Sequence, residues 1–151
     1  MRAVVQRVSR ARVEVAGEIV GEIGPGLAVL LGVARGDSEA EAAAVAAKIA
    51  GLRVFADAAG KMNLSVVDIG GSVLLISQFT LLANLRKGRR PSFTDAAVPA
   101  EAETLVRMIG EHLIELDVTV ATGRFGSHME VDLCNDGPVT IVIDAEDGRV
   151  I

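Results

Sequence analysis

The stretch LAVLLGVARGDSEAEAAAVAAKIAGL, residues 27–52, sets the fold class, because it joins a buried strand directly to a helix. Residues 27–34 form a continuous apolar run of strand length, which is typical of a strand that is covered on both faces. Ser38 followed by Glu41 has the spacing of a capping box, so the sequence predicts a helix over 38–52. A second apolar run, SVLLISQF at 72–79, predicts another buried strand after that helix.

Strand patterns surround this strand–helix–strand unit on both sides. MRAVVQRV alternates as a strand does, and ARVEVAGEIVGEIG indicates two short strands around Ala16-Gly17. Pro99 is suited to the first position of a second helix. Further strands are expected in DVTVAT, MEVDLC and TIVID, whereas AEDGRVI at 145–151 is expected to be a polar turn and a loose end. This order predicts a single mixed α/β domain with two main helices on one side of the sheet.

Composition and charge limit the possible class of the protein, its cellular compartment and its binding partners. Half of its 151 residues are hydrophobic, which suits one globular domain, and no apolar run approaches the ~20 residues of a membrane span. Cys134 is the single cysteine, so we expect a cytoplasmic protein without internal disulfides. The net charge is −5, so any nucleic acid would have to be held locally. The local cations are Arg86, Lys87, Arg89 and Arg90 in LRKGRRPSF, which a solvated loop would also explain.

The usual catalytic patterns are sparse. His112, His128 and Cys134 lie far apart in the sequence, and neither a metal-binding spacing nor a phosphate-binding glycine loop is present. We therefore expect no metal and no cofactor. Ser77 and Thr80, at the end of a buried strand, offer hydroxyl groups, which could act as nucleophiles or only satisfy the strand end. Backbone amides and carbonyls can also orient a polar substrate without any titrating group.

NDGPVT, residues 135–140, separates the predicted strands MEVDLC and TIVID. A turn would explain Gly137 and Pro138, since neither residue suits the middle of a strand. The alternative is that the backbone of these two residues takes part in function, because glycine has no Cβ and lets a ligand approach its carbonyl closely.

Taken together, these segments resemble the D-aminoacyl-tRNA deacylase family, also called D-tyrosyl-tRNA deacylases, over nearly the whole chain. The resemblance is carried by AVVQRVSRARVEV, GEIGPGLAVLLGV, DAAGKMNLSV, SVLLISQFTL, RRPSF, TGRFGSHMEV and NDGPVT, with residues after about 144 outside it. It implies a β/β/α layered fold with a largely antiparallel mixed sheet. It also implies a homodimer that cleaves the ester between a D-amino acid and the 3′ end of tRNA in active sites at the subunit interface.

The resemblance assigns roles to individual residues. A cis Gly137-Pro138 peptide would enter the partner's pocket and read the handedness of the substrate, with Arg7 holding that loop. Ser77, Gln78, Phe79 and Thr80 would line the pocket. Phe125 and Met129 would lie near the terminal adenine, and the cluster of Arg86, Lys87, Arg89 and Arg90 becomes a candidate for contacts to tRNA.

The chemical step has two alternatives. Thr80 could attack the ester, or the protein could position the ester while the ribose 2′-hydroxyl and a water react. Because glycine has no side chain to exclude, glycyl-tRNA is expected to be cleaved as well. The competing functions are a non-catalytic binder of tRNA ends or of D-amino acids, and a Thr80-dependent esterase without an RNA requirement.

Overall fold

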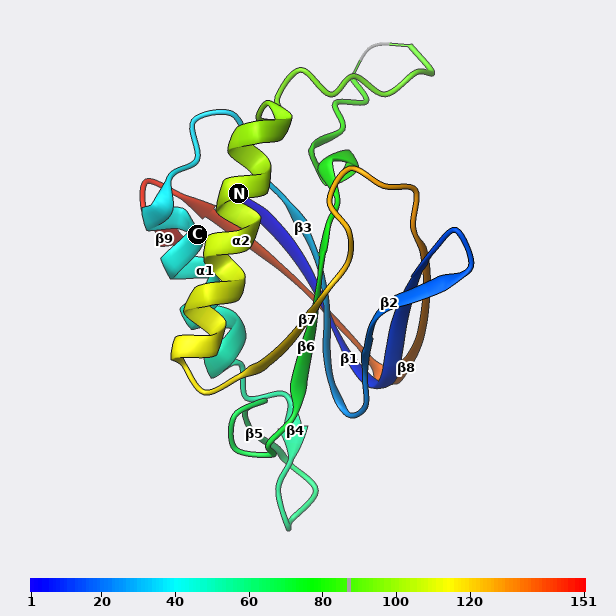
Figure 1. Ribbon diagram of the computed structural model, residues 1–151. Coiled ribbons are helices and arrows are strands. Elements are labelled where there is room, and N and C mark those ends of the chain that lie inside the picture. The colour runs from blue at the N-terminus through cyan, green and yellow to red at the C-terminus, as the bar shows by residue number, and fades with distance from the viewer. Residues whose placement is uncertain (87) are drawn as a thin grey trace.

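The computed structural model describes residues 1–86 and 88–151, and its central element is a curled mixed sheet (Figure 1). The strand order is β7-β6-β3-β1-β8-β9, with β2 paired to β1. Strands β3, β6 and β7 run parallel, whereas β1 pairs antiparallel with β2, β3 and β8. The strands are β1 (Arg2–Val15), β2 (Glu18–Ile23), β3 (Gly26–Gly32), β6 (Ser72–Ser77), β7 (Thr119–Thr122), β8 (Glu130–Glu146) and β9 (Arg149–Val150), with a separate hairpin of β4 (Phe55–Ala56) and β5 (Met62–Leu64).

Both α-helices cover the same face of the sheet, as the sequence predicts (Figure 1). Helix α1 (Glu39–Gly51) begins with the predicted capping box of Ser38 and Glu41, and α2 (Pro99–Glu115) begins at the predicted proline. Val45, Ile49, Ile109 and Leu113 are fully buried between the helices and the sheet. This apolar contact fixes the helices on the sheet.

A second core lies on the opposite face of the sheet. There the sheet curls, so that the end of β1, β2 and the start of β8 fold back over the central strands (Figure 1). Val8, Ala11, Val13, Ile23, Leu74 and Ile76 pack together between these two layers of strand. The arrangement is the predicted β/β/α layering.

Several predicted boundaries are wrong. MRAVVQRV and the adjacent ARVEV form one strand, β1, and MEVDLC and TIVID belong to one strand, β8, because β1 and β8 pair with each other along both interruptions; the second half of ARVEVAGEIVGEIG forms β2 as predicted. The strand predicted at 72–79 ends at Ser77 and gives way to a 3₁₀ turn, η1 (Phe79–Leu82). Residues 145–151 are not a loose end, since β9 pairs with the end of β8 and Gly148 N donates a hydrogen bond to Glu41.

Candidate active site

A cavity of about 550 Å³ opens at the carboxyl end of β6. Its walls come from η1, the segment that connects η1 to α2, the start of α2 and the loop at residues 123–129. The lining is mostly apolar, with polar groups from Ser77, Gln78, Ser127 and His128. The carboxyl ends of parallel strands meet at one edge of a sheet, which is a common place for ligand sites.

Three residues of the SQFT segment contribute to the lining of this cavity. Gln78 N donates a 2.7 Å hydrogen bond to Leu31 O and so extends the pairing of β6 with β3. The next two amides, of Phe79 and Thr80, begin η1 and have no backbone partner among the described residues. Ser77, Gln78 and Phe79 line the cavity, whereas Thr80 does not, and its hydroxyl accepts a hydrogen bond from the Gln78 side chain.

Aromatic and sulfur-containing side chains form the wider part of the cavity. Phe79 and Phe93 meet edge to face, with ring centroids 4.9 Å apart and an angle of 72° between the ring planes. Phe125 and Met129 contribute from the opposite loop. Met129 packs closely over Gly123, where a Cβ would lie only 2.6 Å from the Met129 sulfur. The result is a mostly apolar space with a few polar groups in its lining.

The Gly137-Pro138 segment is an exposed bulge of β8, and its peptide bond is cis. Gln6 pairs with Thr140 and Val8 pairs with Asn135, so residues 136–139 lie opposite Arg7 alone. The Asn135 side chain closes the bulge, because its Oδ1 accepts from Val139 N at 2.8 Å and its Nδ2 donates to Val139 O at 3.2 Å. Four backbone positions therefore project from the sheet as one ordered unit.

Arg7 holds this bulge from the side of the sheet that faces the helices. Its Nε donates to Asp136 O at 2.8 Å, and its Nη1 donates to Val54 O. Gly137 has a φ of +145°, and a Cβ at this position would lie 2.9 Å from Val139 N. Only glycine fits this conformation without moving the neighbouring backbone.

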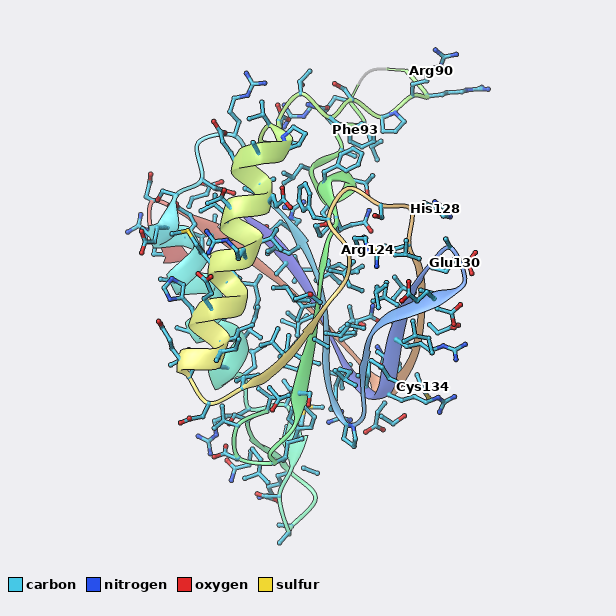
Figure 2. The ribbon with its side chains drawn as sticks, viewed as in Figure 1. Arg90, Phe93, Arg124, His128, Glu130 and Cys134 are labelled. Atoms are coloured by element: carbon cyan, nitrogen blue, oxygen red, sulfur yellow. The ribbon has the colours of Figure 1, made fainter. Side chains whose placement is uncertain are left out.

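The predicted site residues fall into two separate places in the chain. The cavity brings together Ser77, Gln78, Phe79, Phe125 and Met129 but contains none of Arg7, Gly137 and Pro138. Val131 lines the cavity, and Gly137 follows six residues later, roughly 20 Å of extended strand away. In Figure 2, Phe93 and His128 lie at the upper end of the molecule, and Cys134, which precedes the bulge, lies far below them.

The basic cluster lies beside the cavity. Asn84 and Ser92 form an antiparallel bridge, with backbone hydrogen bonds of 2.7 and 3.0 Å, that closes a loop carrying Arg86, Arg89 and Arg90. We call residues 84–86 and 88–92 the cationic loop; Lys87 lies outside the described residues. The three arginines are exposed, and none of them takes part in an ion pair within the described chain. Arg90 projects away from the body of the protein in Figure 2.

Residue patterns do not identify Phe93 or His128 as part of the cavity. Phe93 belongs to the RRPSF segment, in which the sequence singles out only the arginines, and it reaches the cavity because residues 95–97 return to the end of β3. His128 lies in a predicted loop, far in the sequence from the residues it joins. Only three-dimensional proximity brings either side chain to SQFT.

The titrating groups with lowered pKa values stabilise the fold and do not line the cavity. The pKa of Glu41 is lowered to about 2, first by the Ser38 hydroxyl and then by the backbone amides of Gly148 and Ser38. Hydrogen bonds also lower the pKa values of Asp57, Asp68 and Asp144. Within residues 1–86 and 88–151, no three His, Cys, Asp or Glu side chains gather as a metal site would require, and no helix is long and apolar enough to cross a membrane.

Comparison with known proteins gives one consistent result. A family model described as D-Tyr-tRNA(Tyr) deacylase matches residues 4–144. A D-aminoacyl-tRNA deacylase of Symbiobacterium thermophilum is 62% identical over 146 residues, 97% of each chain. One from Heliobacterium modesticaldum is 57% identical over 149 residues, 99% of each chain.

Solved structures agree with the fold. A structure described as c-Myc DNA Unwinding Element Binding Protein superposes with a TM-score of 0.90 at 41% identity, covering 97% of this chain and 99% of the other. A probable eukaryotic D-amino acid tRNA deacylase gives a TM-score of 0.81 at 14% identity, covering 93% and 97% of the two chains. At that identity the second likeness concerns the fold alone.

Proposed function

The chain belongs to the D-Tyr-tRNA(Tyr) deacylase family and is a hydrolase of the D-aminoacyl-tRNA ester; from this premise we propose how its residues select and cleave their substrate. The cavity receives the terminal adenosine of tRNA together with the ester. Phe125 and Met129 offer apolar surface to the adenine, as protein aromatic groups do for unpaired bases. Charged tRNA is used in translation, so a cytoplasmic location is part of the same proposal.

The site is completed by a second copy of the chain. The observation that carries this proposal is the separation of the Gly137-Pro138 bulge from the cavity: one half of the site is a cavity without the bulge, and the other is an exposed bulge without a cavity. Two copies related by a twofold axis would form two equivalent sites, each from the cavity of one subunit and the bulge of the other. Within one chain the two halves do not meet.

An open apolar strip on the sheet supports the same assembly. Val142, Val4 and Leu30 are neighbours across β8, β1 and β3 on the face opposite the helices. Val142 is 58% exposed, and Val4 and Leu30 are half-buried. A second copy covering this strip would remove apolar surface from water and bring its own bulge toward the cavity.

Selection of the D-substrate follows from a rigid, exposed segment of backbone. The carbonyl groups of Gly137 and Pro138 belong to a bulge held by Arg7 and Asn135, so their positions are fixed. An L-amino acid would place its side chain against these carbonyl groups, and a D-amino acid would place its side chain elsewhere. Rejection by a steric clash requires no recognition of the accepted side chain, so glycyl-tRNA is also a substrate.

Hydrolysis uses the RNA rather than a protein nucleophile. The Thr80 hydroxyl lies outside the cavity lining, and in the described part of the chain its hydrogen-bond partner is the Gln78 side chain, not a base. The ribose 2′-hydroxyl and a water then carry out the reaction. The amides of Phe79 and Thr80 are candidates to stabilise the oxyanion; the amide of Gln78 is excluded because it already donates to Leu31 O.

Two other functions have less support from the sequence and the structure. A non-catalytic binder would retain the cavity but leave the ester intact, and a Thr80 esterase would cleave simple aminoacyl esters without RNA. The description of one similar structure refers to DNA binding. The net charge of −5 does not favour extensive DNA contact by this chain, because each phosphate contact needs a nearby cation.

The test is hydrolysis of three substrates by one preparation of purified protein: D-tyrosyl-tRNA, L-tyrosyl-tRNA and glycyl-tRNA. We expect rapid loss of the D-tyrosyl and glycyl esters and persistence of the L-tyrosyl ester. Cleavage of both tyrosyl esters would contradict selection by the bulge. Persistence of glycyl-tRNA would contradict selection by exclusion alone. Persistence of all three esters would favour a non-catalytic binder of tRNA ends.

A further inference from the structure

The aromatic pair at the rim of the cavity connects the cavity, to which the proposed function assigns the adenosine and the ester, with the cationic loop, to which it assigns nothing. Phe79 follows β6 in η1, and Phe93 follows the cationic loop; both line the cavity. Phe79 remains 57% exposed although it is a large apolar side chain. Because Phe79 is both exposed and part of the cavity lining, its ring is accessible to a molecule in the cavity.

The backbone on both sides of Phe93 is tied to the protein. On one side, Ser92 pairs with Asn84 and closes the cationic loop. On the other, Asp95 O accepts a 2.9 Å hydrogen bond from Arg35 N, and Ala97 N donates a 3.0 Å hydrogen bond to Val33 O. Among the described residues, Phe93 is therefore the cavity-lining aromatic residue that adjoins the cationic loop in the chain.

We propose that Phe93 is a positioning residue that aligns the cationic loop with the cavity. Arg89 and Arg90 would hold backbone phosphates of the acceptor end, while the aminoacylated adenosine occupies the cavity. The Phe93 ring, braced on Phe79, fixes the distance between these two contacts. Binding energy gained at the phosphates then helps to orient the ester, which increases the rate on the long substrate only. The inference rests on the proposed function.

The experiment compares two substrates that differ in reach. D-Tyrosyl-tRNA extends to the cationic loop, and the 3′-D-tyrosyl ester of adenosine occupies the cavity alone. The measured quantity is the ratio of kcat/KM on the long substrate to kcat/KM on the short one. We expect Phe93→Leu to lower this ratio about two- to tenfold, the range that an aromatic pair contributes. Phe93→Tyr keeps the ring and should retain most of the ratio.

A double-mutant cycle separates alignment from a general loss of packing. Arg89→Gln/Arg90→Gln should lower the same ratio, and Phe93→Leu added to it should lower the ratio little further, because the two changes remove one coupled effect. Val98→Ala is the matched control: Val98 lies on the same connecting segment, is 53% exposed and does not line the cavity. It should leave the ratio unchanged, and thermal unfolding confirms that each variant is folded.

The outcomes distinguish the possibilities. An equal loss on both substrates after Phe93→Leu would mean that Phe93 acts only inside the cavity, and this would overturn the alignment role. Additive effects of Phe93→Leu and the arginine changes would overturn it as well. If the wild-type protein cleaved neither substrate, the proposed function would fail first, and this inference with it.

Discussion

Arg7 Nε donates a 2.8 Å hydrogen bond to the carbonyl oxygen of Asp136, while Nη1 of the same guanidinium donates to Val54 O. One planar side chain thus connects the bulge of β8 to the segment that follows α1. The side chain is largely buried, at 13% exposure. The orientation of the Gly137 and Pro138 carbonyls therefore depends on a residue that need not touch substrate.

We expect Arg7→Lys to lower kcat/KM on D-tyrosyl-tRNA about ten- to a hundredfold, as the loss of hydrogen bonds from a charged group implies. A lysine ammonium is a point donor and cannot span both carbonyls in the same geometry. Arg10→Lys, at an exposed position of the same strand, is the control and should change the rate little. Equal rates for the two variants would show that the bulge keeps its position without Arg7.

Gly137→Ala should remove most of the activity, because the new Cβ would lie 2.9 Å from Val139 N and φ is +145°. Gly17→Ala is a matched control, since φ there is +82° and nothing lies within 4 Å of the added Cβ. It should cost stability but leave the rate intact. Equal loss of activity in both variants would mean that the effect of Gly137→Ala is not local to the bulge.

Mixing subunits tests whether the cavity and the bulge of one site come from different chains. Gly137→Ala and Phe125→Ala should each be poorly active alone, yet unfolding and refolding them together should restore about a quarter of the wild-type activity. If the protein is a dimer with shared sites, half of the randomly formed dimers would be mixed, and each mixed dimer would have one intact site. No recovery beyond the sum of the separate activities would place both halves of the site in one chain.

Local signals in the sequence predicted some features and missed others for a physical reason. Ser38 and Glu41 identified the start of α1 because a capping box involves only neighbouring residues. NDGPVT has the chemistry of a turn, but pairing of β8 with β1 on both sides of the bulge keeps the strand continuous. Such pairing involves residues more than a hundred positions apart and leaves no local pattern.

In the candidate site, too, local sequence signals predict some residues and miss others. Ser77 and Thr80 were expected near a ligand because they end a buried apolar run; Ser77 lines the cavity, whereas Thr80 does not. Phe93 could not be placed there from its own segment, since hydrogen bonds from Arg35 and Ala97 decide where that segment returns. The separation of Gly137 from Ser77 is likewise a property of topology.

Thr80→Val should retain activity within about fivefold of the wild type if the tRNA 2′-hydroxyl supplies the chemistry, since loss of a protein nucleophile costs several orders of magnitude. Valine keeps the shape of the side chain and removes only the hydroxyl. Thr80→Ser keeps the hydroxyl and serves as the control. Loss of all activity in the valine variant, with recovery in the serine variant, would establish Thr80 as the nucleophile.

Changing Arg86, Arg89 and Arg90 to Gln should flatten the salt dependence of kcat/KM on D-tyrosyl-tRNA. For every phosphate that the protein no longer neutralises, the slope of log kcat/KM against log salt should become shallower by about 0.7–0.9. Arg107→Gln, an exposed change on α2 at a residue paired with Glu111, is the control. An unchanged slope in the triple variant would show that the cationic loop is an ordinary solvated loop that does not contact the phosphates of tRNA.

Glu41 should make the free energy of unfolding depend on pH in the acidic range. Its carboxylate accepts hydrogen bonds from Ser38 N and Ser38 Oγ, both at 2.6 Å, and from Gly148 N, and these lower its pKa from 4.5 to about 2 in the folded state. A lowered folded-state pKa favours the folded protein fully above about pH 4.5, and this advantage disappears as the pH falls toward 2. Glu41→Gln should therefore destabilise the protein by about 1.5–3 kcal/mol at neutral pH.

The difference between wild type and Glu41→Gln should shrink between pH 4.5 and pH 2, as measured by urea unfolding at a series of pH values. Glu39→Gln removes an exposed carboxylate from the same first turn of α1 and should show a much smaller, weakly pH-dependent effect. Because Gly148 lies in the β8–β9 turn, removal of residues 147–151 should reproduce part of the Glu41→Gln loss. A pH-independent difference for Glu41→Gln would mean that packing at this position, and not the ionised carboxylate, connects the C-terminal hairpin to α1.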